Sequence, residues 1–142
     1  MTSDTVHILK SILDSVKSNE LSDDTIEILQ SLLPENLILA AFDLVDREKV
    51  IQYVTAWGGR FYQVLGSTAT YSVYVDMTIA PIPYYCTCPA FAYAVLLSST
   101  HAMCKHVLAT YLARQLSRCT DRSIGPDEFL QVIARHLESD EL

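Results

Sequence analysis

The sequence lacks any apolar run of the roughly 18 to 20 residues that a helix needs to span a bilayer. Its N-terminus lacks the uninterrupted apolar core and small-residue cleavage site of a secretory signal, and it places Asp4 early. We therefore expect a soluble protein in a reducing compartment, the cytosol or the nucleus. Half of its 142 residues are nevertheless hydrophobic, which is a high share for a protein that stays monomeric.

Cysteines are few, and the reducing compartment expected for the protein argues against a disulfide framework. In a reducing compartment, the four cysteines at regular spacings are more typical of metal ligands or catalytic thiols. Disulfide pairing is the less favoured alternative. The chain is long enough to bury a core without disulfides, and it contains no internal repeats. The sequence therefore predicts one domain with appended helices.

Positive charge is scarce, and it is concentrated in the middle of the chain. Residues 1–48 have ten acidic against three basic side chains, a net charge of −7, whereas residues 49–122 have +4 and residues 123–142 have −4. Three thiolates around a divalent metal would lower the middle segment only to about +3. Because affinity for nucleic acid comes largely from cationic contacts to phosphate, this balance favours a protein partner over strong autonomous binding to DNA.

The first 48 residues predict helices. The apolar residues of a first helix recur three or four apart, as Val6, Leu9, Leu13 and Val16. Asp24, with Glu27 three residues later, indicates the N-cap of a second helix that stops at Pro34. The segment "ENLILAAFDLVDRE" is apolar nearly all round, which is typical of a helix buried on several sides. It either packs beneath the sheet or belongs to an obligate interface.

From Lys49 the pattern changes to the alternation of β-strands. "KVIQYV" and "RFYQVLG" flank a Gly58-Gly59 hairpin turn, and "TYSVYVD" predicts a third strand. Pro81 and Pro83 suit an edge or an extended approach. Together these features predict a small antiparallel sheet.

Three helices are expected after the sheet. Pro89 suits the first position of a helix "PAFAYAVLL", a stronger helix runs from about Lys105 to Arg118, and Pro126 opens a last amphipathic helix. The fold class is therefore α+β. We divide the chain into a helical region at 1–48, a sheet with a zinc module at 49–122 whose zinc core is 84–112, and a C-terminal helix or tail at 123–142.

The stretch "YYCTCPAFAYAVLLSSTHAMCKHVLATYL", which begins at Tyr84, has the spacing of a metal site. Cys86 and Cys88 point to the same face if their segment is extended. Helix positions two apart diverge by about 200°, so Cys104 must precede the helix and His106 must lie in its first turn. Three thiolates and one imidazole form a closed tetrahedral set, as structural zinc prefers. We therefore predict one structural zinc ion on these four residues.

The pattern Cys-x-Cys, fifteen residues, Cys-x-His resembles the SWIM zinc finger, and its one-residue gaps are unusual among zinc modules. The segments "DLVDR", "YQVLGS", "YYCTCPAFAYAVL" and "CKHVLATYL" further resemble the small SWIM-domain subunit of Shu complexes, over roughly residues 43–112. The N-terminal helices and the tail after Cys119 match that family only in length and character.

This resemblance implies a non-catalytic role in homologous recombination and DNA repair in the nucleus. Subunits of that family pair with a RecA-like recombinase paralogue, and the pair supports assembly of the strand-exchange recombinase on single-stranded DNA. We expect such a paralogue as the direct partner, with the recombinase and single-stranded DNA reached through the complex, and no membrane. The alternative is a stand-alone nucleic-acid-binding zinc module. A thiol enzyme is disfavoured because no acid is evident to orient His101 or His106.

Several other residues have two interpretations. His101 is the rival of His106 for the imidazole position, and Cys119 is a further candidate thiol that more simply packs in the core, on one helix face with Leu116. Three arginines four residues apart predict a basic stripe on the helix, either a solvated face or a contact for an acidic partner: Arg114, Arg118 and Arg122. Aromatic residues could stack on bases, but their alternation favours packing within the sheet: Trp57, Phe61, Tyr62, Tyr71 and Tyr74.

Overall fold

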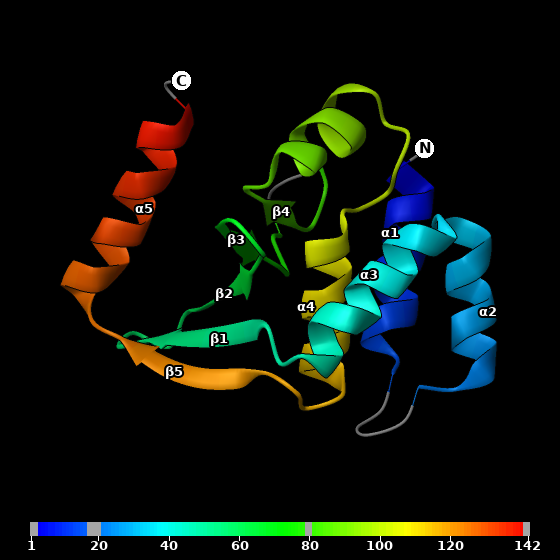
Figure 1. Ribbon diagram of the computed structural model, residues 1–142, viewed down its shortest axis with the longest axis horizontal. Coiled ribbons are helices and arrows are strands. Elements are labelled where there is room, and N and C mark those ends of the chain that lie inside the picture. Colours follow the sequence, from blue (N-terminus) through cyan, green and yellow to red (C-terminus); the bar gives the residue numbers. More distant parts are fainter. Residues whose placement is uncertain (1–2, 17–20, 79–80, 141–142) are drawn as a thin grey trace.

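The computed structural model describes residues 3–16, 21–78 and 81–140 and shows a mixed helical and β-sheet architecture (Figure 1). The fold class predicted from the sequence is confirmed. The helices are α1 (Ser3–Asp14), α2 (Asp23–Leu32), α3 (Glu35–Asp46), the π-helix η1 (Phe91–Leu97), α4 (Lys105–Gln115) and α5 (Pro126–Asp140). The strands are β1 (Val50–Thr55), β2 (Arg60–Leu65), β3 (Thr70–Tyr74), β4 (Tyr85–Cys86) and β5 (Thr120–Ile124).

The strands form one sheet in the order β4-β3-β2-β1-β5. The pairs β1/β2, β2/β3 and β3/β4 are antiparallel, as predicted. The β1/β2 hairpin turns at Gly58, whose φ of 86° favours glycine. The amide of Gly59 donates to Thr55 Oγ1 at 2.8 Å and so closes the turn. The predicted strands and the glycine turn are therefore confirmed.

Strand β5 is the element that the sequence did not predict. It pairs with β1 in parallel, with Ile51 opposite Thr120 and Thr55 opposite Ile124, so the expectation of a purely antiparallel sheet is wrong at this edge. Its sequence, Thr-Asp-Arg-Ser-Ile, is exposed except for Ile124. A polar edge strand shows little alternation, because backbone pairing holds it rather than burial of a side-chain face.

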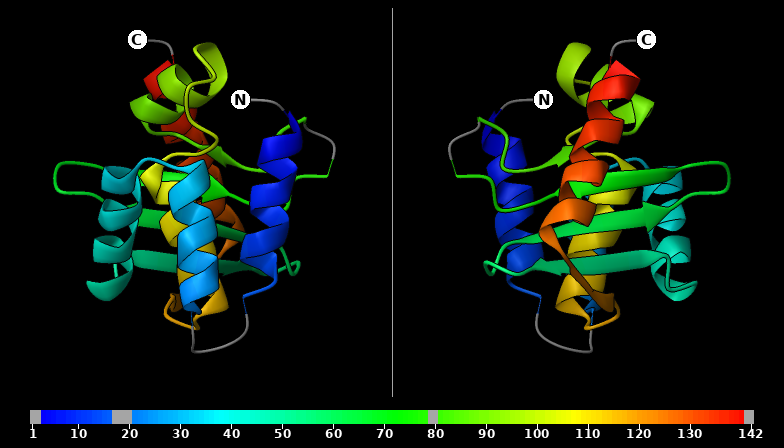
Figure 2. Two further views of the ribbon diagram at one scale, coloured as in Figure 1. Left: turned by 90° about the vertical axis from the view of Figure 1, so that its right-hand side faces the viewer. Right: turned by 90° about the vertical axis from the view of Figure 1, so that its left-hand side faces the viewer.

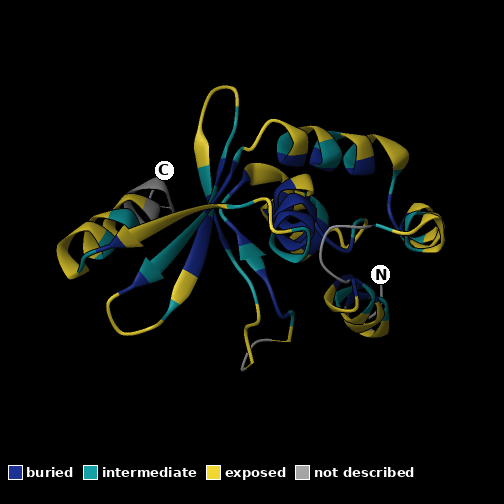
Figure 3. Cartoon of the chain, turned by 90° about the horizontal axis from the view of Figure 1, so that it is seen from below, coloured by how far each residue is buried: buried dark blue, intermediate teal, exposed yellow. Residues whose placement is uncertain are grey.

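Helix α4 is the centre of the molecule. It lies between the sheet and helices α1 to α3, while α5 crosses the opposite face of the sheet (Figures 1 and 2). Every residue from His106 to Ala113 is buried, and buried residues gather around this helix when the chain is seen from below (Figure 3). One hydrophobic cluster joins α1, α2, α3, the sheet, η1 and α4. None of the helices in the described part of the chain has the length and apolar character needed to cross a membrane.

The end of α4 differs from the prediction. The helix stops at Gln115, and Ser117 beyond it has a φ of 57°, which no further helical turn can accommodate. The predicted extension to Arg118 and the arginine stripe are therefore wrong. Arg114 lies in the last turn of α4, Arg118 lies in the connection, and Arg122 lies on β5.

The remaining helices mostly follow the prediction. The N-cap of α2 is Ser22, whose hydroxyl accepts from the amide of Thr25 at 3.2 Å, so the predicted cap at Asp24 is wrong by two residues. Helix α5 begins at Pro126, as expected. The Phe129 ring of α5 makes edge contacts with Trp57 and Phe61 on the outer face of the sheet.

Helix α3 is buried on one side and open on the other. Ile38, Ala41 and Val45 are buried, whereas Leu39 is 60% exposed. The buried side packs mainly against α4. The sequence left two placements open for this helix, packing within the fold or an interface with a partner. Packing within the fold is observed for one face. The opposite face stays uncovered.

An ionic network connects α1, the segment after β3 and α4. The guanidinium of Arg114 donates to Asp76 Oδ2 at 2.5 Å and to Asp14 Oδ1 at 3.0 Å. Lys10 Nζ lies 2.6 Å from Asp14 Oδ2 and 3.3 Å from Asp76 Oδ1. Two cations and two carboxylates thus alternate around one junction. Because Arg114 and Lys10 are largely covered, this network is stronger than an isolated surface pair.

We expect Arg114→Ala to lower the free energy of unfolding by about 2 kcal/mol, because it removes charge-assisted hydrogen bonds to Asp14 and Asp76. Urea denaturation measures the change. Arg118→Ala is the matched control at an exposed position, and we expect it to change stability by less than about 0.5 kcal/mol. Equal losses in the two variants would contradict a specific role for the network.

The same junction predicts a pH dependence of stability. Burial acts to raise the pKa of Asp76, but hydrogen bonds and charge from Arg114 and Lys10 outweigh it and lower that pKa below its usual 3.8. Such a carboxylate contributes stability that is present above the pKa of the unfolded chain and is lost as the pH falls through the folded value. The stability difference between wild type and Asp76→Asn should be largest above about pH 4 and shrink below it. Urea titrations at several pH values test this, and a difference that does not vary with pH would refute it.

Candidate metal centre

The first half of the centre is the Cys-x-Cys segment at the edge of the sheet. Cys86 ends β4, where it pairs with Val73 of β3. Thr87 continues the contact with β3, because its amide donates to the Ser72 carbonyl at 3.1 Å and its Oγ1 accepts from the Ser72 amide at 3.0 Å. Cys88 then accepts on Sγ from the amide of Phe91 at 3.3 Å. Backbone pairing therefore holds the segment extended and leaves both thiols to the same side, as the spacing predicts.

The second half of the centre is the start of α4. Cys104 is the N-cap, with extended φ and ψ of −91° and 170°, and His106 is the second residue of the helix. The sequence argument for this placement is confirmed. The His106 ring lies against the Tyr71 ring, with centroids 4.7 Å apart. Thr110 donates to the His106 carbonyl at 2.8 Å, one helical turn later.

The two halves bring their donor atoms together. One donor atom from each of Cys86, Cys88, Cys104 and His106 lies within 4.8 Å of all the others, and all four residues are buried. His106 Nδ1 has no hydrogen-bond partner among the described residues, although it is buried. Buried polar atoms normally have a partner. Three sulfurs and one imidazole are the donors that tetrahedral zinc prefers, so the residues present fit one zinc ion.

The proton affinities of the three thiols show the crowding of the site. Burial raises the pKa of Cys104 to about 12. Hydrogen bonding with Cys104 and Cys88 raises the pKa of Cys86, while hydrogen bonds from Cys104 and Cys86 lower the pKa of Cys88. The three sulfurs therefore do not titrate independently, because the charge on each one acts on the other two. Full ionisation of three adjacent buried sulfurs requires a positive charge between them.

The two rival ligands lie outside the cluster. His101 is half-buried, and its backbone amide donates to the Ala94 carbonyl at 3.1 Å. Cys119 packs against the hydrophobic core, just before β5, and burial raises its pKa to about 11. The preference for a packed Cys119 is thus confirmed, although it does not share a helix face with Leu116. In the part of the chain that the structure describes, only the four predicted residues form such a group.

Tyr84 supports the segments that contain the ligands, and the sequence analysis did not identify this role. Tyr84 is buried, its hydroxyl donates to the Ala102 carbonyl, and its ring meets Phe91 and Tyr111 edge-on. It therefore connects the segment before Cys86 to the segment before Cys104. Tyr84 directly precedes β4, which is only two residues long, so the alternation of apolar residues there gives little signal for this role.

Most of the aromatic residues pack within the fold, as their alternation predicts. Phe61 and Tyr62 are buried, Tyr74 stacks on Phe61, and Tyr71 covers His106. Trp57 is 60% exposed, with its ring edge against Phe129. Packing within the fold therefore explains these aromatic residues, and stacking on nucleic-acid bases is not needed to explain them.

We expect the purified chain to contain one zinc ion per molecule and His106→Ala to lose it, because a site with three donors binds the metal far more weakly. His101→Ala is the matched control and should retain the metal. Cys119→Ser should likewise retain zinc, whereas Cys88→Ser should not. Inductively coupled plasma mass spectrometry measures the content. Zinc retained by His106→Ala and lost from His101→Ala would assign the imidazole to the rival residue.

Known proteins resemble much of the chain. Zinc finger SWIM domain-containing protein 7 of Homo sapiens is 37% identical over 94 residues, which are 66% of this chain and 63% of the human protein. That of Mus musculus is 38% identical over 96 residues, 67% of this chain and 59% of the relative. That of Danio rerio is 32% identical over 101 residues, 71% and 69% of the two chains. The chain therefore spans less than two thirds of the human and mouse proteins. No solved structure matches it.

The matching family model is the SWIM zinc finger, over residues 71–115. This range begins in β3 and ends with α4, so it contains the four clustered residues and the elements that position them. The relatives extend the likeness beyond that module to about two thirds of the chain or more. The chain belongs to the family of zinc finger SWIM domain-containing protein 7, and its SWIM zinc finger has a buried site for a single metal ion.

Proposed function

We propose that the chain is a non-catalytic binding subunit whose structural zinc holds a protein-docking surface in shape. The observation that supports this most is the closed metal site: Cys86, Cys88, Cys104 and His106 supply four protein donors, and all are buried. A catalytic zinc ion keeps a coordination position for water or substrate. A closed, buried site has the features of a structural centre.

The partner that we propose is a RecA-like recombinase paralogue. Support comes from the resemblance of residues 43–112 to the small SWIM-domain subunit of Shu complexes and from membership in the SWIM family. In this proposal the pair promotes homologous recombination in the nucleus by supporting assembly of the strand-exchange recombinase on single-stranded DNA. The charge distribution is consistent with a protein partner, since the +4 middle segment lies between acidic flanks.

The experiment is copurification of the tagged full-length chain from its own cells, followed by titration calorimetry with the recovered RecA-like protein. We expect a defined complex with wild type and with Cys119→Ser. Cys88→Ser should lose both its zinc and the partner, because zinc binding is coupled to folding of the module. Absence of every RecA-like protein from the recovered partners would overturn the proposed function and leave the metal assignment intact.

A second measurement separates this function from a stand-alone nucleic-acid module. Fluorescence anisotropy with a labelled single-stranded oligonucleotide at physiological salt should show no binding tighter than about 1 µM by the chain alone, the upper end of non-specific affinities. Tighter binding that is lost in Arg118→Glu or Arg122→Glu would favour the alternative, because both arginines are exposed.

A further inference from the structure

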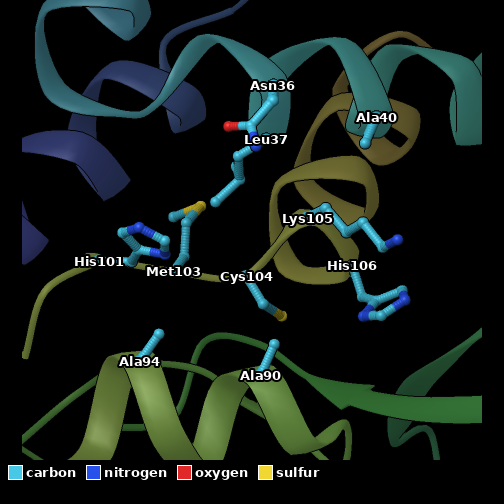
Figure 4. Close-up of a pocket in the computed structure, with 10 residues that line it drawn as sticks. All are labelled: Asn36, Leu37, Ala40, Ala90, Ala94, His101, Met103, Cys104, Lys105 and His106. Carbon is cyan, nitrogen blue, oxygen red and sulfur yellow. The ribbon is translucent and has the colours of Figure 1, made fainter. Parts of the chain in front are cut away.

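A groove lies beside the metal centre, between α3 and η1. Its volume is about 300 Å³. Figure 4 shows Leu37 and Ala40 of α3 on one side, Ala90 and Ala94 on the other, and Met103 between them. The space exists because the facing positions are alanines, whose side chains end at Cβ. It is at the small end of ligand pockets, which hold about 300 to 1000 Å³, and so suits one or two apolar side chains better than a large cofactor.

A second cavity continues the first along α3. It has a volume of about 340 Å³, shares Ala40, Lys105 and His106 with the first, and extends to Lys49 and the turn after β2. The residues of α3 that line the two cavities lie on one helix face, together with the C-cap of this helix: Asn36, Leu37, Ala40, Asp43, Leu44 and Arg47. We call this continuous surface the α3 groove. It borders the buried side of α3, because Leu37 and Leu44 are partly buried against the core, and the exposed Leu39 does not line it.

The two ends of the α3 groove differ in charge. The end near Ala90 and Ala94 has an apolar lining. At the other end Arg47 Nε is neutralised by Asp43 Oδ1 at 3.0 Å, while Lys49 and Lys105 form no ion pair with any described carboxylate. That end therefore has an excess of positive charge. A ligand that complements both ends of the groove would have an apolar side chain at one end and a carboxylate at the other.

We propose that the α3 groove binds a peptide segment of the partner protein, with an apolar side chain between Ala40 and Ala94 and an acidic residue beside Lys49 and Lys105. This inference rests on the proposed function, which supplies the partner. A buried apolar anchor contributes affinity, and a charge pair at the rim contributes orientation and association rate. Nucleic acid fits the surface less well, because Lys105 is the only lysine or arginine among the described residues that line the first cavity, whose other side chains around Ala90 and Ala94 are largely apolar.

The test uses zinc-loaded full-length chain and the copurified RecA-like protein in titration calorimetry. Ala94→Leu fills the apolar end and should raise Kd by about tenfold or more, which corresponds to losing one well-placed anchor. Ala92→Leu is the matched control, because it is the same change on the same helix at an exposed residue that does not line the groove. It should change Kd by less than about twofold.

The charged end is tested separately. Lys49→Glu should weaken binding and reduce its dependence on salt, whereas Arg118→Glu, an equal charge change at an exposed position away from the groove, should do neither. Zinc content and melting temperature establish that each variant is folded. If Ala94→Leu fails to fold, Ala40→Leu fills the same space from α3, and Lys49→Glu tests the other end.

The outcomes distinguish this inference from the proposed function. Wild-type affinity in the folded groove variants would overturn the groove as the docking site while the partner assignment stands. Failure of wild type to bind any RecA-like protein would overturn both. Concentration-dependent self-association in analytical ultracentrifugation, abolished by Ala94→Leu but not by Ala92→Leu, would show that the occupant is a second copy of the chain and would contradict the proposal.

Discussion

The structure depends on an electrostatic constraint at the junction of β4, η1 and α4. Four donor atoms lie within 4.8 Å of one another in the buried interior. Three adjacent sulfurs cannot all be ionised there without a cation, since charge repulsion and burial both favour the thiols. A zinc ion would remove this conflict, because its positive charge would lie closest to the sulfurs and its tetrahedral preference matches the four donors. The cluster is therefore a weak point of the metal-free chain and a crosslink in the metal-bound one.

The crosslink matters because the elements on one side of it are weak by themselves. Strand β4 has two residues, and a π-helix such as η1 is an uncommon arrangement. Phe91 and Val95 anchor η1 in the core, but Leu97 is 79% exposed, so little apolar burial stabilises the segment. Helix α4, in contrast, is buried along most of its length. Coordination would attach the least stable elements to the most stable one.

Much of this arrangement could be predicted from the sequence, because spacing directly restricts geometry. Side chains two residues apart lie on the same face of a strand but on nearly opposite faces of a helix. This rule was sufficient to place Cys104 before α4 and His106 inside it. The alternation of apolar residues likewise gave β1, β2 and β3. The sequence failed where tertiary contacts decide. Strand β5 is held by pairing with β1, and Arg114 is separated from Arg118 by a left-handed residue at Ser117 that no sequence signal marks.

The metal centre and the α3 groove share residues, which gives the structural ion a second consequence. Cys104 and His106 are clustered donors, and both also line the groove, with Lys105 between them in sequence. Met103, in the middle of the groove, directly precedes the first of these donors. Holding these two donors in place would also hold the backbone of the neighbouring Met103 and Lys105, which line the same groove. A surface positioned in this way is preorganised, so its ligand loses less free energy to ordering the receptor. Zinc would thus act on binding through geometry alone.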